Sequence, residues 1–230
     1  MNNSNDWHES QNDNYLNLSR TRLSQPKLKW VDQFASIINS KTKLIIDSSN
    51  SINQSFLCND FGCNVGHFFR GVEDIILPIN YRGYDISEIY LKIARNEFGF
   101  EYFENLDVAS ESIDKLPRDA DISVVSATLE HIENYHVALK NIFLTTRCLV
   151  VLRTFIGDLP LKDYCRTHGA KRDYLIRQFT LDDLVSLPAN LGWFYSVHED
   201  IATQGIQKMV CNGNTIPRTQ KILVFSRGVK

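Results

Sequence analysis

The stretch over residues 56–69, FLCNDFGCNVGHFF, constrains the fold of this chain more than any other. It begins as a short, mostly apolar run and continues into a turn bounded by Gly62 and Gly66. Such an apolar run is typical of a buried parallel strand. Glycine lets the backbone pass close to a ligand because no Cβ intervenes. The residues that follow, 67–72, are predicted to be helical, so their first N–H groups point at the turn. The stretch therefore predicts a nucleotide-type cofactor site at the carboxyl end of a first strand.

Strands and helices are predicted to alternate along the rest of the chain. Further strands are expected over residues 81–86, 100–106, 121–127, 148–154, 193–201 and 221–226. Helices are expected over residues 28–38, 87–98 and 135–144, and from Thr180, where Asp183 completes a capping box. The polar run between the last two strands suits a hairpin connection. This pattern predicts an α/β fold, a doubly wound, mostly parallel seven-stranded sheet with an antiparallel last strand.

The length of 230 residues suits one domain with a sizeable core. Residues 1–26 are rich in Asn, Ser and charge, and we expect a flexible N-terminal arm there. Residues 27–230 are expected to form the domain, and the irregular stretch at about 155–180 is expected to be an insert on the substrate side.

The charge and the cysteines narrow the classes of partner. The formal net charge of −2 and the pI of about 6.3 argue against a nucleic-acid polymer and favour a small-molecule substrate. A polar N-terminus and the lack of a long apolar run predict a cytoplasmic protein without a membrane partner. We expect either a monomer or a homodimer. The five cysteines are scattered and form no CxxC pair, so we expect reduced thiols and no metal site.

The glycine turn does not fit the dinucleotide fingerprint G-x-G-x-x-G, because Asn64 stands where the middle glycine would be. The run DFGCNVG over residues 60–66 instead resembles the first motif of class I S-adenosylmethionine-dependent methyltransferases, D-x-G-C-G-x-G, at every position except Asn64. Asparagine tolerates left-handed backbone better than other non-glycine residues do. The departure at Asn64 therefore weakens the resemblance without breaking it.

The resemblance extends to three later segments of the chain. Asp85 and Ile86 resemble the family's second motif, which implies a carboxylate on the ribose of the cofactor. Asp107 and Val108 stand where the family places an acid near the adenine amino group and a backbone N–H near the ring. The run over residues 121–132 is similar to the family pattern that ends in L-E-H. The cofactor-binding residues implied in this way are Asp60, Gly62, Cys63, Asn64, Gly66, Asp85, Ile86, Asp107, Val108 and Ser126.

Each of these roles has a plainer alternative. Asp85 could be the N-cap of the next helix, and Asp107 could be a solvated loop acid. Asp60 could order the turn or reach the amino group of the cofactor through water. Cys63 is read as a packing residue, because no base or cation stands near it in the sequence.

Histidine is the natural general base near neutral pH, and the resemblance puts His131 on the carboxyl rim of the sheet. The alternative is that His131 holds the loop after the fourth strand. His168 is a second catalytic candidate, and His67 is a weaker one. The residues expected to bind the substrate are Glu130, Arg172, Tyr174 and Arg177, although the basic cluster in the insert could equally be a solvated loop.

The resemblance implies a methyltransferase that uses S-adenosylmethionine, releases S-adenosylhomocysteine and methylates a small molecule, with oxygen as the expected acceptor atom. Two alternatives remain open at this point. One is a non-catalytic methyltransferase-like partner subunit. The other is a nicotinamide-dependent oxidoreductase, which the absent G-x-G-x-x-G fingerprint disfavours.

Overall fold

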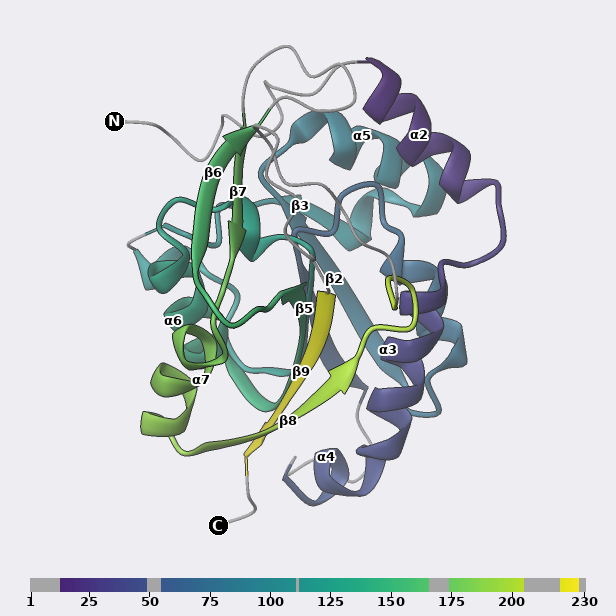
Figure 1. Cartoon of the computed structure of the whole chain (residues 1–230). Helices are drawn as coiled ribbons and strands as arrows, with labels where there is room; N and C mark the ends of the chain where they lie inside the picture. The colour runs from purple at the N-terminus through teal and green to yellow at the C-terminus, as the bar shows by residue number, and fades with distance from the viewer. Residues whose placement is uncertain (1–12, 49–54, 111, 166–173, 205–219, 228–230) are drawn as a thin grey trace.

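The computed structural model describes residues 13–48, 55–110, 112–165, 174–204 and 220–227 of the chain. A seven-stranded sheet runs through the centre, with helices on both of its faces (Figure 1). The strands of this sheet are β1 (Phe56–Phe61), β2 (Ile79–Asp85), β3 (Phe103–Asn105), β4 (Ala120–Ser126), β5 (Thr146–Phe155), β8 (Trp193–Glu199) and β9 (Gln220–Arg227). The α-helices are α2 (Asp13–Leu23), α3 (Lys29–Ser40), α4 (Thr42–Ser48), α5 (Glu88–Phe98), α6 (Tyr135–Thr145) and α7 (Leu181–Asn190). Short 3₁₀ helices are η1 (Phe68–Asp74), η2 (Phe100–Tyr102), η3 (Ile113–Lys115) and η4 (Leu129–His131).

The strand order in the sheet is β3-β2-β1-β4-β5-β9-β8. Strand β1 pairs in parallel with both β2 and β4, whereas β9 is antiparallel to both β5 and β8. The chain runs outward from β1 to β3 and then returns to β4 on the other side of β1. This reversal creates a crevice at the carboxyl ends of β1 and β4, where α/β proteins bind their ligands. The predicted fold class, a mostly parallel seven-stranded sheet with an antiparallel last strand, is confirmed.

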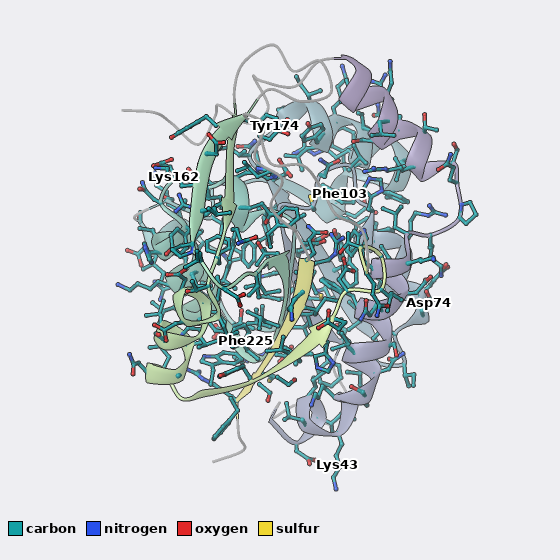
Figure 2. The ribbon with its side chains drawn as sticks, viewed as in Figure 1. Lys43, Asp74, Phe103, Lys162, Tyr174 and Phe225 are labelled. Carbon is teal, nitrogen blue, oxygen red and sulfur yellow. The ribbon has the colours of Figure 1, made fainter. Side chains whose placement is uncertain are left out.

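Alternate residues of the central strands face two separate apolar cores. Along β5, Leu149 and Val151 belong to one core, whereas Val150 and Leu152 belong to the other. The first core is covered by α3, α4, η1 and α5, and the second by α6 and α7, which lie on opposite sides of the sheet in Figure 1. Phe225 of β9, labelled in Figure 2, is fully buried in the second core. Burial on both faces explains why β5 reads as an almost continuous apolar run.

Several helix boundaries agree with the sequence predictions. Helix α5 begins after Ser87 and ends before Gly99, whose φ of 118° breaks the helical path. Helix α7 begins after Thr180, whose hydroxyl accepts a hydrogen bond from the Asp183 N–H while the Asp183 carboxylate accepts one from the Thr180 N–H. The predicted capping box is therefore confirmed.

The helix expected over residues 67–72 differs in type from the prediction, because the segment forms the 3₁₀ helix η1. Gly71 of η1 approaches α3 so closely that a Cβ there would lie 2.5 Å from the Val31 Cγ1 atom. Glycine also disfavours a regular α-helix. Close packing on α3 therefore sets the path of this segment.

Two stretches without a clear sequence pattern contain regular structure. Helix α2 lies within the expected arm at residues 1–26, and the Arg22 carbonyl at its end accepts a hydrogen bond from Arg70 Nη1 at 3.3 Å. In the insert, β6 (Leu161–Cys165) and β7 (Tyr174–Gln178) form an antiparallel hairpin. Lys162 and Tyr174, labelled in Figure 2, belong to its two strands. Within the described ranges, no helix combines the length and the apolar character needed to cross a bilayer.

Candidate active site

A cavity lies at the switch point of the sheet, where the carboxyl ends of β1, β2, β4 and β5 meet. Strand ends and the loops that follow them form one wall, and residues of α2 and of the start of α3 form the other. The predicted residues that line this cavity are Asp60, Gly62, Cys63, Asn64, Asp85, Ile86, Asp107, Val108, Ser126 and His131. The fold therefore brings together side chains from four separate segments of the sequence.

The loop after β1 has the left-handed backbone that its sequence predicts. Gly62, Asn64 and Gly66 have φ angles of 76°, 53° and 86°. Asparagine reaches this region at lower cost than other non-glycine residues, so Asn64 fits in place of the motif glycine. Gly62 is also required by space, because a Cβ there would lie 2.2 Å from Thr128 Oγ1. The loop thus passes close to Thr128 and presents its backbone to the cavity.

Asp85, the last residue of β2, ties this loop to the neighbouring strand. Its Oδ2 accepts a hydrogen bond from the Asn64 N–H at 2.8 Å, and its Oδ1 accepts one from the Ser87 N–H at 2.8 Å. Burial raises the pKa of Asp85 to about 6, although these hydrogen bonds oppose the shift. A carboxylate has about four acceptor sites, so Asp85 can still accept a hydrogen bond from a ligand hydroxyl. Ser87, rather than Asp85, is the N-cap of α5.

Asp60 of β1 is almost completely buried next to the loop. Tyr81 donates its hydroxyl to Asp60 Oδ2 at 2.8 Å. Burial raises the pKa of Asp60 to about 7; the Tyr81 hydrogen bond opposes this shift and the nearby Asp85 carboxylate adds to it. A cationic group in the cavity would favour the ionised form of Asp60. Burial also raises the pKa of the Cys63 thiol well above its usual range, which agrees with a packing role for Cys63.

Asp107 and Val108 form the part of the wall that follows β3. Asp107 Oδ1 accepts a hydrogen bond from the Ala109 N–H at 2.9 Å. Asn141 of α6 donates its Nδ2 to the Val108 carbonyl at 3.0 Å and to the Ser110 carbonyl at 2.8 Å. These bonds hold the loop at the edge of the cavity where the family resemblance implies the adenine ring.

His131 ends η4, directly after β4. Its Nδ1 lies 2.8 Å from the Leu175 carbonyl of β7. A carbonyl oxygen can only accept, so the hydrogen bond assigns the proton of the neutral ring to Nδ1 and makes Nε2 the basic nitrogen. Tyr174 packs edge-on against the imidazole, with ring centroids 5.7 Å apart. The β6–β7 hairpin therefore sets both the orientation and the tautomer of His131.

Comparison with known protein families agrees with this geometry. The family model described as a methyltransferase domain matches residues 59–147, which begin within β1 and end within β5. Together with the strand order, this match decides the identity of the domain. The chain carries a class I methyltransferase domain. No curated protein sequence matches the methyltransferase.

Several solved structures share the fold of the methyltransferase. DesVI from Streptomyces venezuelae is 13% identical, with 94% of this chain and 98% of that chain covered and a TM-score of 0.60. CalS10 from Micromonospora echinaspora, an amino pentose methyltransferase solved with bound S-adenosylmethionine, is 12% identical, with 93% and 97% covered and a TM-score of 0.59. Magnesium protoporphyrin IX methyltransferase from Synechocystis, also solved with the cofactor, is 17% identical, with 85% and 80% covered and a TM-score of 0.51. Because these sequence identities are low, the structural likeness establishes a shared fold and nothing beyond it.

Four of the residues that were predicted to bind the cofactor or the substrate of the methyltransferase do not line the cavity. Gly66 packs near Phe98 and Phe103, at 2.9 and 3.0 Å from where its Cβ would be. Glu130 is fully buried, with Oε2 accepting a hydrogen bond from Thr154 Oγ1 at 2.8 Å.

The other two residues belong to the hairpin. Tyr174 packs against His131, which lines the cavity. The guanidinium carbon of Arg177 lies 4.6 Å from the Tyr135 ring centroid. His168 and Arg172 lie outside the described residues.

Other residues of the methyltransferase line the cavity although the sequence analysis gave them no binding role. Among them are Arg22 of α2, Trp30 of α3 and Arg153 of β5. His67, the weaker catalytic candidate, also lines it; burial lowers its pKa to about 4, and Arg22 and Arg70 contribute to the shift. A charged residue within the apolar run of β5 was the one local signal that pointed to Arg153. In the described part of the chain, no three His, Cys, Asp or Glu side chains gather as metal ligands do.

Proposed function

We propose that this methyltransferase binds S-adenosylmethionine in the cavity and methylates an oxygen atom of a small-molecule acceptor, with His131 as general base. When bound, the cofactor supplies a methyl group activated by its sulfonium centre, and S-adenosylhomocysteine is the product. One observation carries the proposal: His131, oriented by the hairpin, lines the same cavity as the Gly62 loop and Asp85.

The residues present fit the cofactor. The absence of a Cβ at Gly62 lets the loop pack against Thr128, and both residues line the cavity that the cofactor would occupy. Asp85 can accept a hydrogen bond from a ribose hydroxyl, and Asp60 keeps Oδ1 without a donor among the described residues, which suits an ammonium group. We assign Asp107 and Val108 to the adenine, and Arg22 to the carboxylate of the cofactor, because Arg22 lies beside His67 just past the loop.

His131 provides the basic group that oxygen methylation needs. The proton of the acceptor hydroxyl passes to Nε2, while Nδ1–H stays bound to the Leu175 carbonyl. The imidazolium that forms keeps both N–H groups as donors, so the orientation of the ring is preserved. Trp30 on α3, Leu28 just before α3 and Ile132 after η4 supply apolar surface that orients an acceptor and keeps water away.

The geometry of the cavity also disfavours the two alternative functions. A nicotinamide-dependent oxidoreductase would need the G-x-G-x-x-G turn, which is absent from the loop after β1. A non-catalytic partner subunit would need no base in the cavity, whereas His131 lies there with a defined tautomer.

Calorimetry with cofactors tests the first part of the proposal. We expect S-adenosylhomocysteine to bind the purified chain and NAD not to bind. Binding of NAD in its place would refute the assignment of the cavity.

Substitution of His131 tests the second part. His131→Ala should lower the turnover of a methylated acceptor about 10²-fold or more while the affinity for S-adenosylhomocysteine stays unchanged. His136→Ala is the matched control, because His136 is exposed on α6 and does not line the cavity. A His131→Ala enzyme with near-normal turnover would remove His131 as the base.

A further inference from the structure

Besides Arg22 and His67, three carboxylates and two basic side chains line the cavity, and the strand order separates these five. Asp60 and Asp85 belong to β1 and β2, and Asp107 follows β3. His131 follows β4, and Arg153 belongs to β5. Because the strand order is β3-β2-β1-β4-β5, these three carboxylates occupy one end of the crevice, and His131 and Arg153 occupy the other. The proposed cofactor fills the acidic end, so the acceptor meets Arg153.

Arg153 is a buried guanidinium with donors to spare. The residue is 7% exposed. Its Nη2 donates to Asp200 Oδ2 at 3.0 Å, and its Nη1 makes only a long contact of 3.4 Å with Ser126 Oγ. Its Nε is buried and has no acceptor among the described residues. An unpaired buried donor is costly, and a guanidinium that lines a cavity with so few acceptors of its own can donate to a ligand there.

Asp200 holds Arg153 in place and is itself hydrogen-bonded to two further donors. Besides Arg153, its carboxylate accepts hydrogen bonds from the Ala202 N–H and the Thr203 hydroxyl, and the residue is fully buried. On the other side, the Arg153 guanidinium carbon lies 5.7 Å from the Trp30 ring centroid. With the ion pair at one edge and the indole nearby, the guanidinium is fixed before any ligand arrives, which lowers the entropy lost on binding.

We propose that Arg153 binds a carboxylate carried by the methyl acceptor, and that the acceptor is therefore a small apolar acid. This inference rests on the proposed function. A carboxylate matches the planar fork of arginine. A phosphate would bring about twice the charge to a guanidinium that Asp200 already neutralises, and of the described residues that line the cavity, Arg153 is the only arginine contributed by the sheet. Trp30 offers a flat apolar surface for the rest of the molecule.

Binding of matched probes tests the inference without any turnover. Ligand-observed NMR titrations, with saturating S-adenosylhomocysteine, would compare benzoate with its neutral isostere benzamide. We expect benzoate to bind the wild-type protein about tenfold more tightly, the ratio typical of a charge-assisted hydrogen bond. Equal affinities would overturn the inference. Tighter binding of phenyl phosphate than of benzoate would overturn the choice of carboxylate.

Variants of the ion pair assign the preference to Arg153. The double variant Arg153→Met/Asp200→Leu removes both buried charges together, so neither is left unpaired. We expect it to bind both probes equally. Arg153→Lys keeps the charge but loses the fork, and it should lower the benzoate preference at least about threefold even if the double variant fails to fold. Arg147→Met is the control, because Arg147 lies on β5 like Arg153 and forms an ion pair with Asp121 of β4, but does not line the cavity. A preference that survives in the Arg153 variants would overturn the inference.

The cofactor also carries a carboxylate that Arg153 could bind. A fragment of the cofactor without this carboxylate distinguishes that possibility from binding of the acceptor. If Arg153 held the carboxylate of the cofactor, its substitution would weaken S-adenosylhomocysteine but not 5′-methylthioadenosine, which lacks the amino-acid portion. That result would overturn the inference. A wild-type protein that binds no S-adenosylhomocysteine would refute the proposed function, whereas one that binds it without preferring benzoate would refute the role of Arg153 alone.

Discussion

The close approach of Gly62 to Thr128 makes a quantitative prediction about the cofactor loop. A Cβ added at Gly62 would lie 2.2 Å from Thr128 Oγ1, 2.4 Å from Cγ2 and 2.8 Å from Cβ. Rotation of the Thr128 side chain cannot relieve the last contact, because the Cβ atom does not move with χ1. Gly62→Ala must therefore displace backbone as well as a side chain.

Comparison with Gly192 separates the backbone strain of Gly62→Ala from its steric overlap with Thr128. Gly192 has a φ of 81°, close to the 76° of Gly62, but a Cβ there would meet nothing within 4 Å. Gly192→Ala should thus lower the free energy of unfolding by about 1 kcal/mol, the backbone penalty less the gain from a stiffer unfolded chain. Gly62→Ala adds overpacking of about 1–3 kcal/mol, for a total of about 2–4 kcal/mol.

Urea denaturation of four proteins measures these values. They are the wild type, Gly62→Ala, Thr128→Gly and the double variant Gly62→Ala/Thr128→Gly. Because Thr128→Gly removes all three close atoms, the double-mutant cycle should give a favourable coupling energy of about 1–3 kcal/mol. Equal destabilisation by Gly62→Ala and Gly192→Ala, or a coupling energy near zero, would refute the steric argument and leave only backbone strain.

Three further predictions follow from other contacts. Asp60 should make the free energy of unfolding fall as the pH rises from about 4 to about 7, because its folded-state pKa, about 7, exceeds its ordinary value of 3.8 and the native state holds that proton more tightly; His67, whose pKa is lowered to about 4, acts in the opposite direction up to about pH 6.5. Asp60→Asn should flatten this decline in urea titrations at several pH values, above all between about pH 6 and 7, where Asp85 no longer contributes; an unchanged slope would contradict the burial argument. Asp85→Ala should weaken S-adenosylhomocysteine binding by roughly 2–3 kcal/mol in calorimetry, and an unaltered affinity would exclude Asp85 from the site. Thr180→Ala should lower the free energy of unfolding by about 1 kcal/mol through loss of the capping box, with cofactor affinity unaffected because Thr180 lies outside the cavity; no change in stability would argue against the cap.

The first-strand loop shows how far the sequence alone could go. Its two glycines predicted a turn at the end of the strand, and the φ angle at Asn64 agrees with the tolerance for left-handed backbone expected of asparagine. The acid at the end of β2 was also predictable, because strands that alternate with helices end at the same edge of a parallel sheet. These inferences succeeded because each depends on residues close together in the sequence.

The acceptor side of the site escaped prediction for the opposite reason. Arg22 and Trp30 reach the cavity from helices far from it in the sequence, and no local pattern marks them. The β6–β7 hairpin gave no clear period, yet its Leu175 carbonyl sets the tautomer of His131. The sequence analysis looked for substrate-binding arginines in the insert and gave no role to Arg153 within the sheet, where the structure places a buried guanidinium with an unpaired Nε–H.

Conformational preferences of neighbouring residues determined the alternation of strands and helices, the turns that glycine and asparagine permit, and the helix caps. Tertiary structure alone decided which side chains share the cavity, how burial raises the pKa of Asp60 and Asp85, and which donor of Arg153 stays unpaired. Backbone preferences act over a few neighbouring residues and are therefore legible in the sequence. Burial and hydrogen-bond partnership depend on atoms that folding brings together from distant segments, so they exist only in the folded chain.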